Sequence, residues 1–131
     1  MARGDSMPKG NRGGKRSGGL PFKNEAQAEV YANQQLKKAG VSRYGDVPEH
    51  GVTSKRAKNV ALSASSDISN GHKPRDSNFS KKTARDALKI AEHDRLALHR
   101  SFLSIHGPSY DQYKKLLSDS DKTINFFKSK L

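Results

Sequence analysis

Six cations near the start of the chain stand among glycines, a composition that suits contacts to phosphate groups. Residues 1–23 carry these six against one acid, and the stretch Gly10–Gly19 is of low complexity. Such a segment favours polyanions, above all nucleic acid, through release of condensed counterions. A solubilising tail is the alternative. The six cations are Arg3, Lys9, Arg12, Lys15, Arg16 and Lys23.

A second set of cations falls on a helix that we predict over residues 81–106. Lys81, Arg85 and Lys89 recur every four residues, so they line one helix face, roughly opposite the apolar face. A solvated outer face is the alternative and the more common use of such a stripe. The charge around this helix favours binding to phosphates over a merely solvated face, because residues 53–107 carry eleven cations against five acids. The cations assigned to binding there are Lys55, Arg56 and Lys58.

The sequence around these cations gives no signal for reading bases. Arg12 begins the single Arg-Gly-Gly triplet, and the stretch Gly10–Gly19 holds no aromatic residue. Proteins that bind single strands by stacking need aromatic side chains among their cations. We therefore expect contacts to phosphates, which position a protein on nucleic acid without specifying a sequence.

The spacing of the histidines does not suit a metal ion. A metal pair on a helix needs imidazoles four residues apart, so that both reach one ion. His93 and His99 are six apart, and His99 and His106 are seven apart. Seven residues correspond to about 10 Å along a helix axis. We expect no metal site and no cofactor.

No pattern in the chain indicates catalysis. Gly14-Lys15 is followed by Arg16, and Lys9 stands where a phosphate-binding loop of the P-loop type needs its first glycine. Serines are abundant, but no motif fixes one of them beside a histidine and an acid. We expect a non-enzymatic protein without a small-molecule substrate.

The bulk composition limits the class of protein. The chain has 131 residues, 32% of them hydrophobic, which allows only a small core. It has no cysteine, so it forms no disulfide, which fits a reducing compartment. No apolar stretch is long enough to insert into a membrane, and the basic N-terminus lacks the apolar region of a signal peptide. We expect an intracellular location or one within a virus particle.

Helical periodicity predicts the elements that position the cations. The central helix over 81–106 repeats apolar residues at three- and four-residue steps as far as Ile105, before Gly107 and Pro108. Asn24, Thr53 and Ser109 are expected caps of other helices. The other predicted helices cover residues 25–39, 54–69, 110–117 and 119–129.

The expected fold is a small all-α domain of four to five helices over residues 24–131, behind a disordered basic arm over 1–23. Residues 24–52 form a helix and linker that we expect to be loosely attached. Phe126 and Phe127 are adjacent, so they diverge by about 100° on a helix. Either both enter the core or one of them docks onto a partner protein.

Two functional hypotheses follow. In the first, the chain is a nucleic-acid-associated structural protein of a larger assembly, such as a virion, a ribosome-like particle or a nucleoid particle. Its helical body would dock onto protein while its cations bind phosphates. In the alternative, the chain is a protein-interaction module (an assembly, cement or inhibitor protein) whose basic surface recognises an acidic protein.

Overall fold

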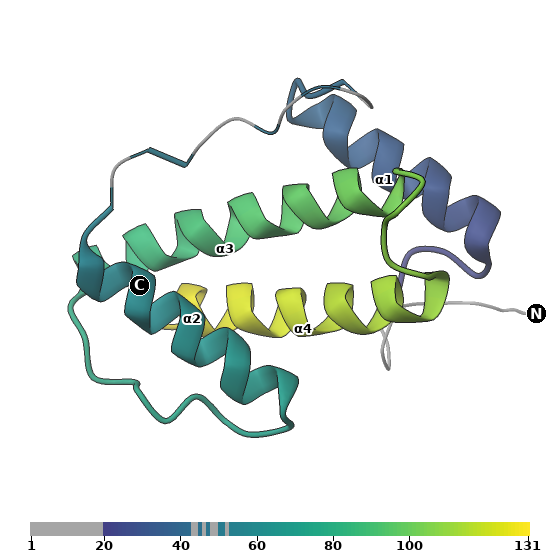
Figure 1. Ribbon diagram of the computed structural model, residues 1–131. Helices are drawn as coiled ribbons and strands as arrows, with labels where there is room; N and C mark the ends of the chain where they lie inside the picture. Colours follow the sequence, from purple (N-terminus) through teal and green to yellow (C-terminus); the bar gives the residue numbers. More distant parts are fainter. Residues whose placement is uncertain (1–19, 43–44, 46, 48–49, 52) are drawn as a thin grey trace, which may run out of the picture.

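The computed structural model describes residues 20–42, 45, 47, 50–51 and 53–131, and this part of the chain forms helices only (Figure 1). The all-α class is therefore confirmed for these residues, whereas residues 1–19 lie outside them. The four helices are α1 (Glu25–Lys38), α2 (Lys55–Ser69), α3 (Lys81–Phe102) and α4 (Tyr110–Lys128).

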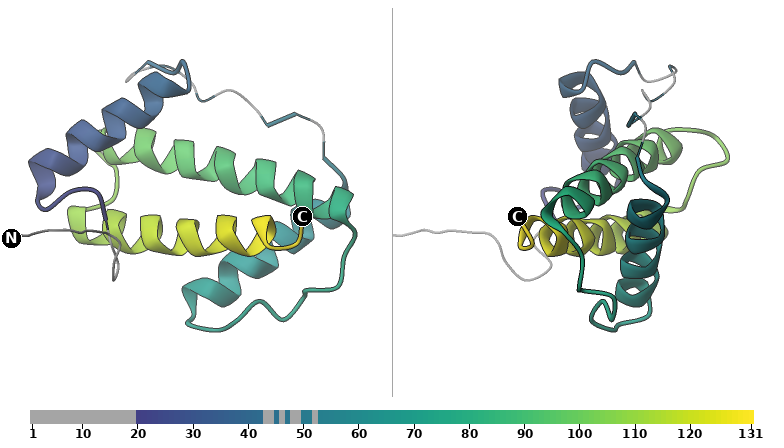
Figure 2. Two further views of the ribbon diagram at one scale, coloured as in Figure 1. Left: turned by 180° about the vertical axis from the view of Figure 1, so that it is seen from behind. Right: turned by 90° about the vertical axis from the view of Figure 1, so that its left-hand side faces the viewer.

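An antiparallel hairpin of α3 and α4 forms the centre of the fold, and the two shorter helices pack onto it. α1 contacts α3, while α2 contacts both α3 and α4. Seen along the hairpin, α1 and α2 lie on opposite sides of it (Figure 2). No described helix is both long enough and apolar enough to cross a membrane.

The core consists of two clusters, one toward each end of the hairpin. The first joins α2 to the beginning of α3 and the end of α4. The second joins α1 to the end of α3 and the beginning of α4. The buried members of the first are Val60, Ala61, Ala64, Ala87, Ala91, Ile124 and Phe127. Those of the second are Phe22, Ala28, Ala32, Phe102, Tyr113 and Leu117.

The folded body begins before α1. Phe22 is only 6% exposed, and its ring lies 5.9 Å from that of Tyr113 and 5.6 Å from that of Tyr31. Leu20 packs against the same cluster. Leu20 and Phe22 therefore pack with the helices, although they lie in the segment 1–23 that we predicted as a basic arm.

The starts of the helices follow the predicted caps closely. Asn24 accepts a hydrogen bond from the Gln27 amide, and Ser109 and Gln112 form a reciprocal capping box. α2 is capped by Ser54 rather than by Thr53, because the Ser54 hydroxyl accepts from the Ala57 amide. The helix consequently begins at Lys55, one residue later than predicted.

The end of α3 differs from the prediction. The helix stops at Phe102, and Ile105 is 96% exposed although it continues the apolar periodicity. Both the amide and the hydroxyl of Ser104 donate to the Ser101 carbonyl, which turns the chain. Gly107 then passes so close to this carbonyl that a side chain there would collide with it.

The two C-terminal helices that we predicted are a single helix, α4. The predicted break at Ser118 placed Asp119 and Asp121 at the start of a further helix, where acids favour the helix dipole. Inside α4, however, Asp119 pairs with Lys115 one turn earlier, and Asp121 pairs with Arg95 of α3. These ion pairs stabilise acids at interior helix positions, so the helix continues.

Candidate functional site

Three helix ends meet at one end of the hairpin: the starts of α2 and α3 and the end of α4 (Figure 1). Phe79, just before α3, lies with its ring 6.1 Å from Phe126 and 6.0 Å from Phe127. The Lys130 ammonium lies 5.3 Å from the Phe126 ring. Residues at the C-terminus thus stand beside the start of the central helix.

Eight cations gather on the first turns of α2 and α3 and at the end of α4, and we name them the basic end. Seven of them are exposed and Lys130 is half-buried. Lys82 pairs with Asp86 at 3.0 Å, whereas the other seven form no ion pair within the described part of the chain. The members are Lys55, Lys58, Lys81, Lys82, Arg85, Lys89, Lys128 and Lys130.

The helix dipoles add to this positive charge. α2 and α3 both begin with lysine after a serine cap, and neither has an acid in its first turn. The N-terminus of a helix carries about half a positive charge, so a cation placed there is disfavoured by about 0.3–1 kcal/mol. Lysines at helix N-termini thus cost free energy in the free protein, and a bound anion would relieve this cost.

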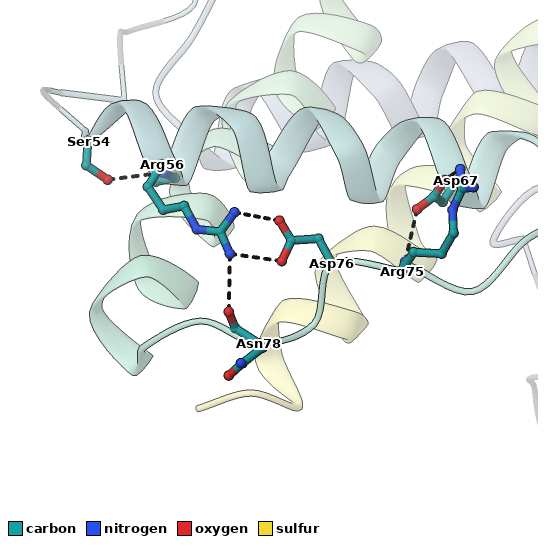
Figure 3. Close-up of polar contacts among 7 residues, drawn as sticks. Ser54, Arg56, Asp67, Arg75, Asp76 and Asn78 are labelled. Atoms are coloured by element: carbon teal, nitrogen blue, oxygen red, sulfur yellow. Dashed lines mark hydrogen bonds and ion pairs between the residues drawn. The ribbon is translucent and has the colours of Figure 1, made fainter.

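Arg56, a predicted phosphate ligand, is exposed but already paired with another side chain of the protein (Figure 3). Its guanidinium donates to both carboxylate oxygens of Asp76, at 2.6 and 2.9 Å, and to the Asn78 carbonyl at 3.2 Å. The hydrogen bond from Arg56 lowers the pKa of the Asp76 carboxyl. Arg56 therefore holds the loop between α2 and α3, and Asp76 offsets its charge.

A second arginine fixes the other end of this loop (Figure 3). Asp67, buried in α2, accepts hydrogen bonds from the Arg75 backbone at 3.0 Å and from its guanidinium at 2.7 Å. These hydrogen bonds lower the pKa of Asp67. The sequence contains one signal for this contact, because Asp67 interrupts the apolar face of α2 beside Ile68.

The remaining predicted site residues are distributed differently. Lys23 is exposed and follows Phe22, which packs against the end of α3 and the beginning of α4, so it lies at the opposite end of the hairpin. Phe127 is fully buried and Phe126 is half-buried, so Phe127 has no surface to offer a partner. The predicted ligands Arg3, Lys9, Arg12, Lys15 and Arg16 lie outside the described residues.

A buried polar pair, which the sequence reasoning missed, links α3 to α4. His99 is 1% exposed, and its Nδ1 lies 2.7 Å from the Tyr113 hydroxyl. Burial, with a smaller effect of the nearby Arg95 cation, lowers the pKa of His99 to about 4. Burial likewise raises the pKa of Tyr113. Both groups are neutral near pH 7 and enclosed, so their role is structural.

Arg95 extends this polar pair toward α1. Its guanidinium donates to the Tyr31 hydroxyl at 2.9 Å and to the Asp121 carboxylate. These contacts join α1, α3 and α4 at one point. They help to hold α1 against α3 and α4, although the buried residues of α1 are mostly alanines.

A pair of histidines and a cavity lie away from the basic end. The ring centroids of His50 and His93 are 5.2 Å apart, although the residues are 43 positions apart in the sequence. The described residues nevertheless contain no group of three side chains able to hold a metal ion. A cavity of about 200 Å³ lies between α2, α3 and α4, with Leu98 and Leu116 beside Asp94 and Asp119.

The comparisons with known proteins give no relative on which to base a function. No family model matches the chain, and no curated protein or solved structure shows a significant match. The candidate site therefore rests on the geometry and charge of the basic end.

Proposed function

We propose that this protein binds nucleic acid through its phosphates, without sequence specificity, as a non-enzymatic structural component of a larger assembly. The carrying observation is the basic end, where the starts of α2 and α3 meet the end of α4 and seven of the eight cations on them have no ion pair among the described residues. Such charge in a free protein is self-repulsive, and a polyanion relieves the repulsion.

The mode of binding follows from the side chains. Lysine is a compact point charge on a flexible stem, and all members of the basic end except Arg85 are lysines. Lysines attract phosphates without the planar fork with which arginine reads guanine in the major groove. Binding should therefore depend on salt and be nearly indifferent to sequence. The cations of residues 1–19 add a second source of phosphate contacts.

The test is fluorescence anisotropy of the full-length protein with labelled duplex DNA, single-stranded DNA and RNA across a salt series. For a duplex, the slope of the logarithm of the binding constant against the logarithm of the salt concentration is about −0.9 per phosphate contact. Tight binding with a steep negative slope supports the proposal. Weak binding to all three probes at physiological salt contradicts it.

The structure supplies a matched pair of single substitutions for the same assay. Lys55→Gln removes a cation without an ion pair, so the magnitude of the slope should fall by about one. Arg56→Gln removes the adjacent cation, whose charge Asp76 already offsets, so the slope should change less. If Lys55→Gln and Arg56→Gln changed the slope equally, the ion pair of Arg56 would make no difference to binding, and the proposed role of the basic end would be wrong.

The alternative is a module that recognises an acidic protein, and one observation favours it. Leu62 is 72% exposed on α2, four residues after Lys58 and seven after Lys55, so the three side chains share one face. An apolar residue among cations suits a protein surface better than a phosphate backbone. A protein-only binder would carry no nucleic acid through purification, whereas a nucleic-acid binder would raise the 260/280 absorbance ratio until high salt is applied.

A further inference from the structure

Two histidines bring the connector between α1 and α2 back to the central helix. His50 lies in this connector and His93 in α3, and their rings meet edge to face with centroids 5.2 Å apart. Both residues are half-buried. The spacing of the histidines along α3 excluded a metal pair within that helix, whereas this pair joins the helix to another segment.

The same connector contains two buried polar atoms without a partner. Within the described part of the chain, the His50 Nδ1 and the Thr53 hydroxyl are the buried side-chain atoms that make no hydrogen bond. An unsatisfied buried polar group costs about 1–3 kcal/mol, so such groups in proteins usually bind an ordered water or an ion. Imidazole nitrogen is the commonest metal ligand among side chains. The unpartnered nitrogen of His50 therefore points to a ligand at this contact.

The arrangement of the two rings suits a shared metal ion. Zinc binds imidazole nitrogens at about 2.0–2.1 Å in tetrahedral geometry, which places the centres of two ligating rings about 5 Å apart. The distance between the His50 and His93 centroids agrees with this value. The Asp94 carboxylate lies 3.6 Å from His93 Nδ1. Because ligating histidines usually turn their second ring nitrogen toward a carboxylate, Nε2 of His93 is the nitrogen left for the ion.

We propose that His50 and His93 together bind one divalent transition-metal ion such as zinc, through His50 Nδ1 and His93 Nε2, with water in the remaining positions. The described residues hold no group of three ligating side chains, so this site is open and exchangeable, unlike a closed structural zinc site. Magnesium and calcium prefer oxygen ligands and do not suit it. The bound ion ties the connector to α3, independently of nucleic-acid binding.

The test is a calorimetric titration of the full-length protein, first treated with a chelator, with zinc chloride at about pH 7.5, where an ordinary imidazole is neutral. We expect one ion per chain. His50→Gln and His93→Gln should each weaken binding at least tenfold, since even the loss of a residue behind a ligand costs about 10–100-fold. His72→Gln and His106→Gln remove exposed histidines elsewhere and should leave the affinity unchanged.

Proton NMR of the wild-type protein provides a readout that does not depend on how well a variant folds. Zinc should shift the ring resonances of His50 and His93, assigned by their absence from the two variants, and leave those of His72 and His106 in place. Zinc should also raise the Tm of the wild-type protein and of both control variants. A wild-type protein that binds no zinc overturns the inference, as do shifts confined to other histidines. Equal affinity in either ligand variant, or equal loss in a control variant, overturns it too.

None of these outcomes bears on the proposed function, which the anisotropy assay tests in the absence of metal.

Discussion

Single residues show where charge and burial decide the behaviour of this small domain. Lys55 and Arg56 are adjacent cations at the start of α2, yet Asp76 offsets only the second. The sequence predicted the same role for both, because the partner of Arg56 lies 20 positions away. The stripe of Lys81, Arg85 and Lys89 could be read from its four-residue spacing, whereas a tertiary ion pair leaves no such periodic signal.

His99 makes the fold sensitive to acid. Its pKa is about 4 in the folded protein and about 6.5 in an unfolded chain, so the unfolded state binds the proton first as the pH falls. The free energy of unfolding should therefore decrease from pH 6.5 to about pH 4, by up to about 3 kcal/mol, and this contribution should then level off. Urea unfolding at pH 7, 5.5 and 4.5 measures it.

The control for this prediction is the exposed His106, whose substitution His106→Gln should leave the pH dependence unchanged. His99→Gln should lower stability at pH 7 and flatten the dependence between pH 6.5 and 4. A His99→Gln protein with the wild-type pH profile would exclude this imidazole as the cause.

Gly107 tests the turn that ends α3. A methyl group there would meet the Ser101 carbonyl, so Gly107→Ala should lower the free energy of unfolding by about 1–3 kcal/mol, the usual cost of overpacking. Ile105→Ala in the same turn should change it by less than about 0.5 kcal/mol, because Ile105 is exposed. If the order of the two effects were reversed, α3 would extend to residue 106 as its periodicity predicted.

At the scale of elements, starts were more predictable than ends. Asn24 and Ser109 cap the starts of α1 and α4 with side-chain oxygens that accept hydrogen bonds from residues three positions later. The local sequence is therefore enough to predict where these helices begin. Within α4, Asp119 pairs with Lys115 four residues earlier, whereas Asp121 pairs with Arg95 of another helix, a contact that no local pattern indicates. Likewise, Lys128 and Lys130 join the basic end only because α4 runs back along α3, which no local pattern reports.

The segment before α1 provides the prediction at this scale. If Phe22 anchors α1 to α4 as its burial indicates, Phe22→Ala should cost about 3–5 kcal/mol, the usual value for a buried phenylalanine. Leu62→Ala, which truncates an exposed apolar side chain, is the matched control and should be nearly neutral. Thermal or urea unfolding measures the difference, and a neutral Phe22→Ala would show that this side chain does not hold α1 against α4.

At the scale of the whole molecule, the net charge of +12 lowers the stability of the free protein, whereas it would strengthen the proposed binding to a polyanion. Self-repulsion opposes the compact state, and salt screens it with a Debye length of about 10 Å at 0.1 M. Added salt should therefore raise the Tm of the free protein. If the protein binds duplex as proposed, the bound duplex stabilises the fold by mass action and salt weakens its binding, so the same addition of salt should lower the Tm of the complex.

The two melting curves should consequently converge as salt increases. In a variant that carries Lys55→Gln, Lys58→Gln, Lys81→Gln, Arg85→Gln and Lys89→Gln, the salt-dependent rise in the Tm of the free protein should be smaller, because five of the repelling cations are gone. If the duplex binds as proposed, the gain in Tm on adding duplex should also be smaller, because five of the cations that attract it are gone. If duplex raised the Tm equally at low and high salt, the interaction would not be electrostatic, and the exposed Leu62 on α2 would be the next residue to test as part of a protein-binding surface.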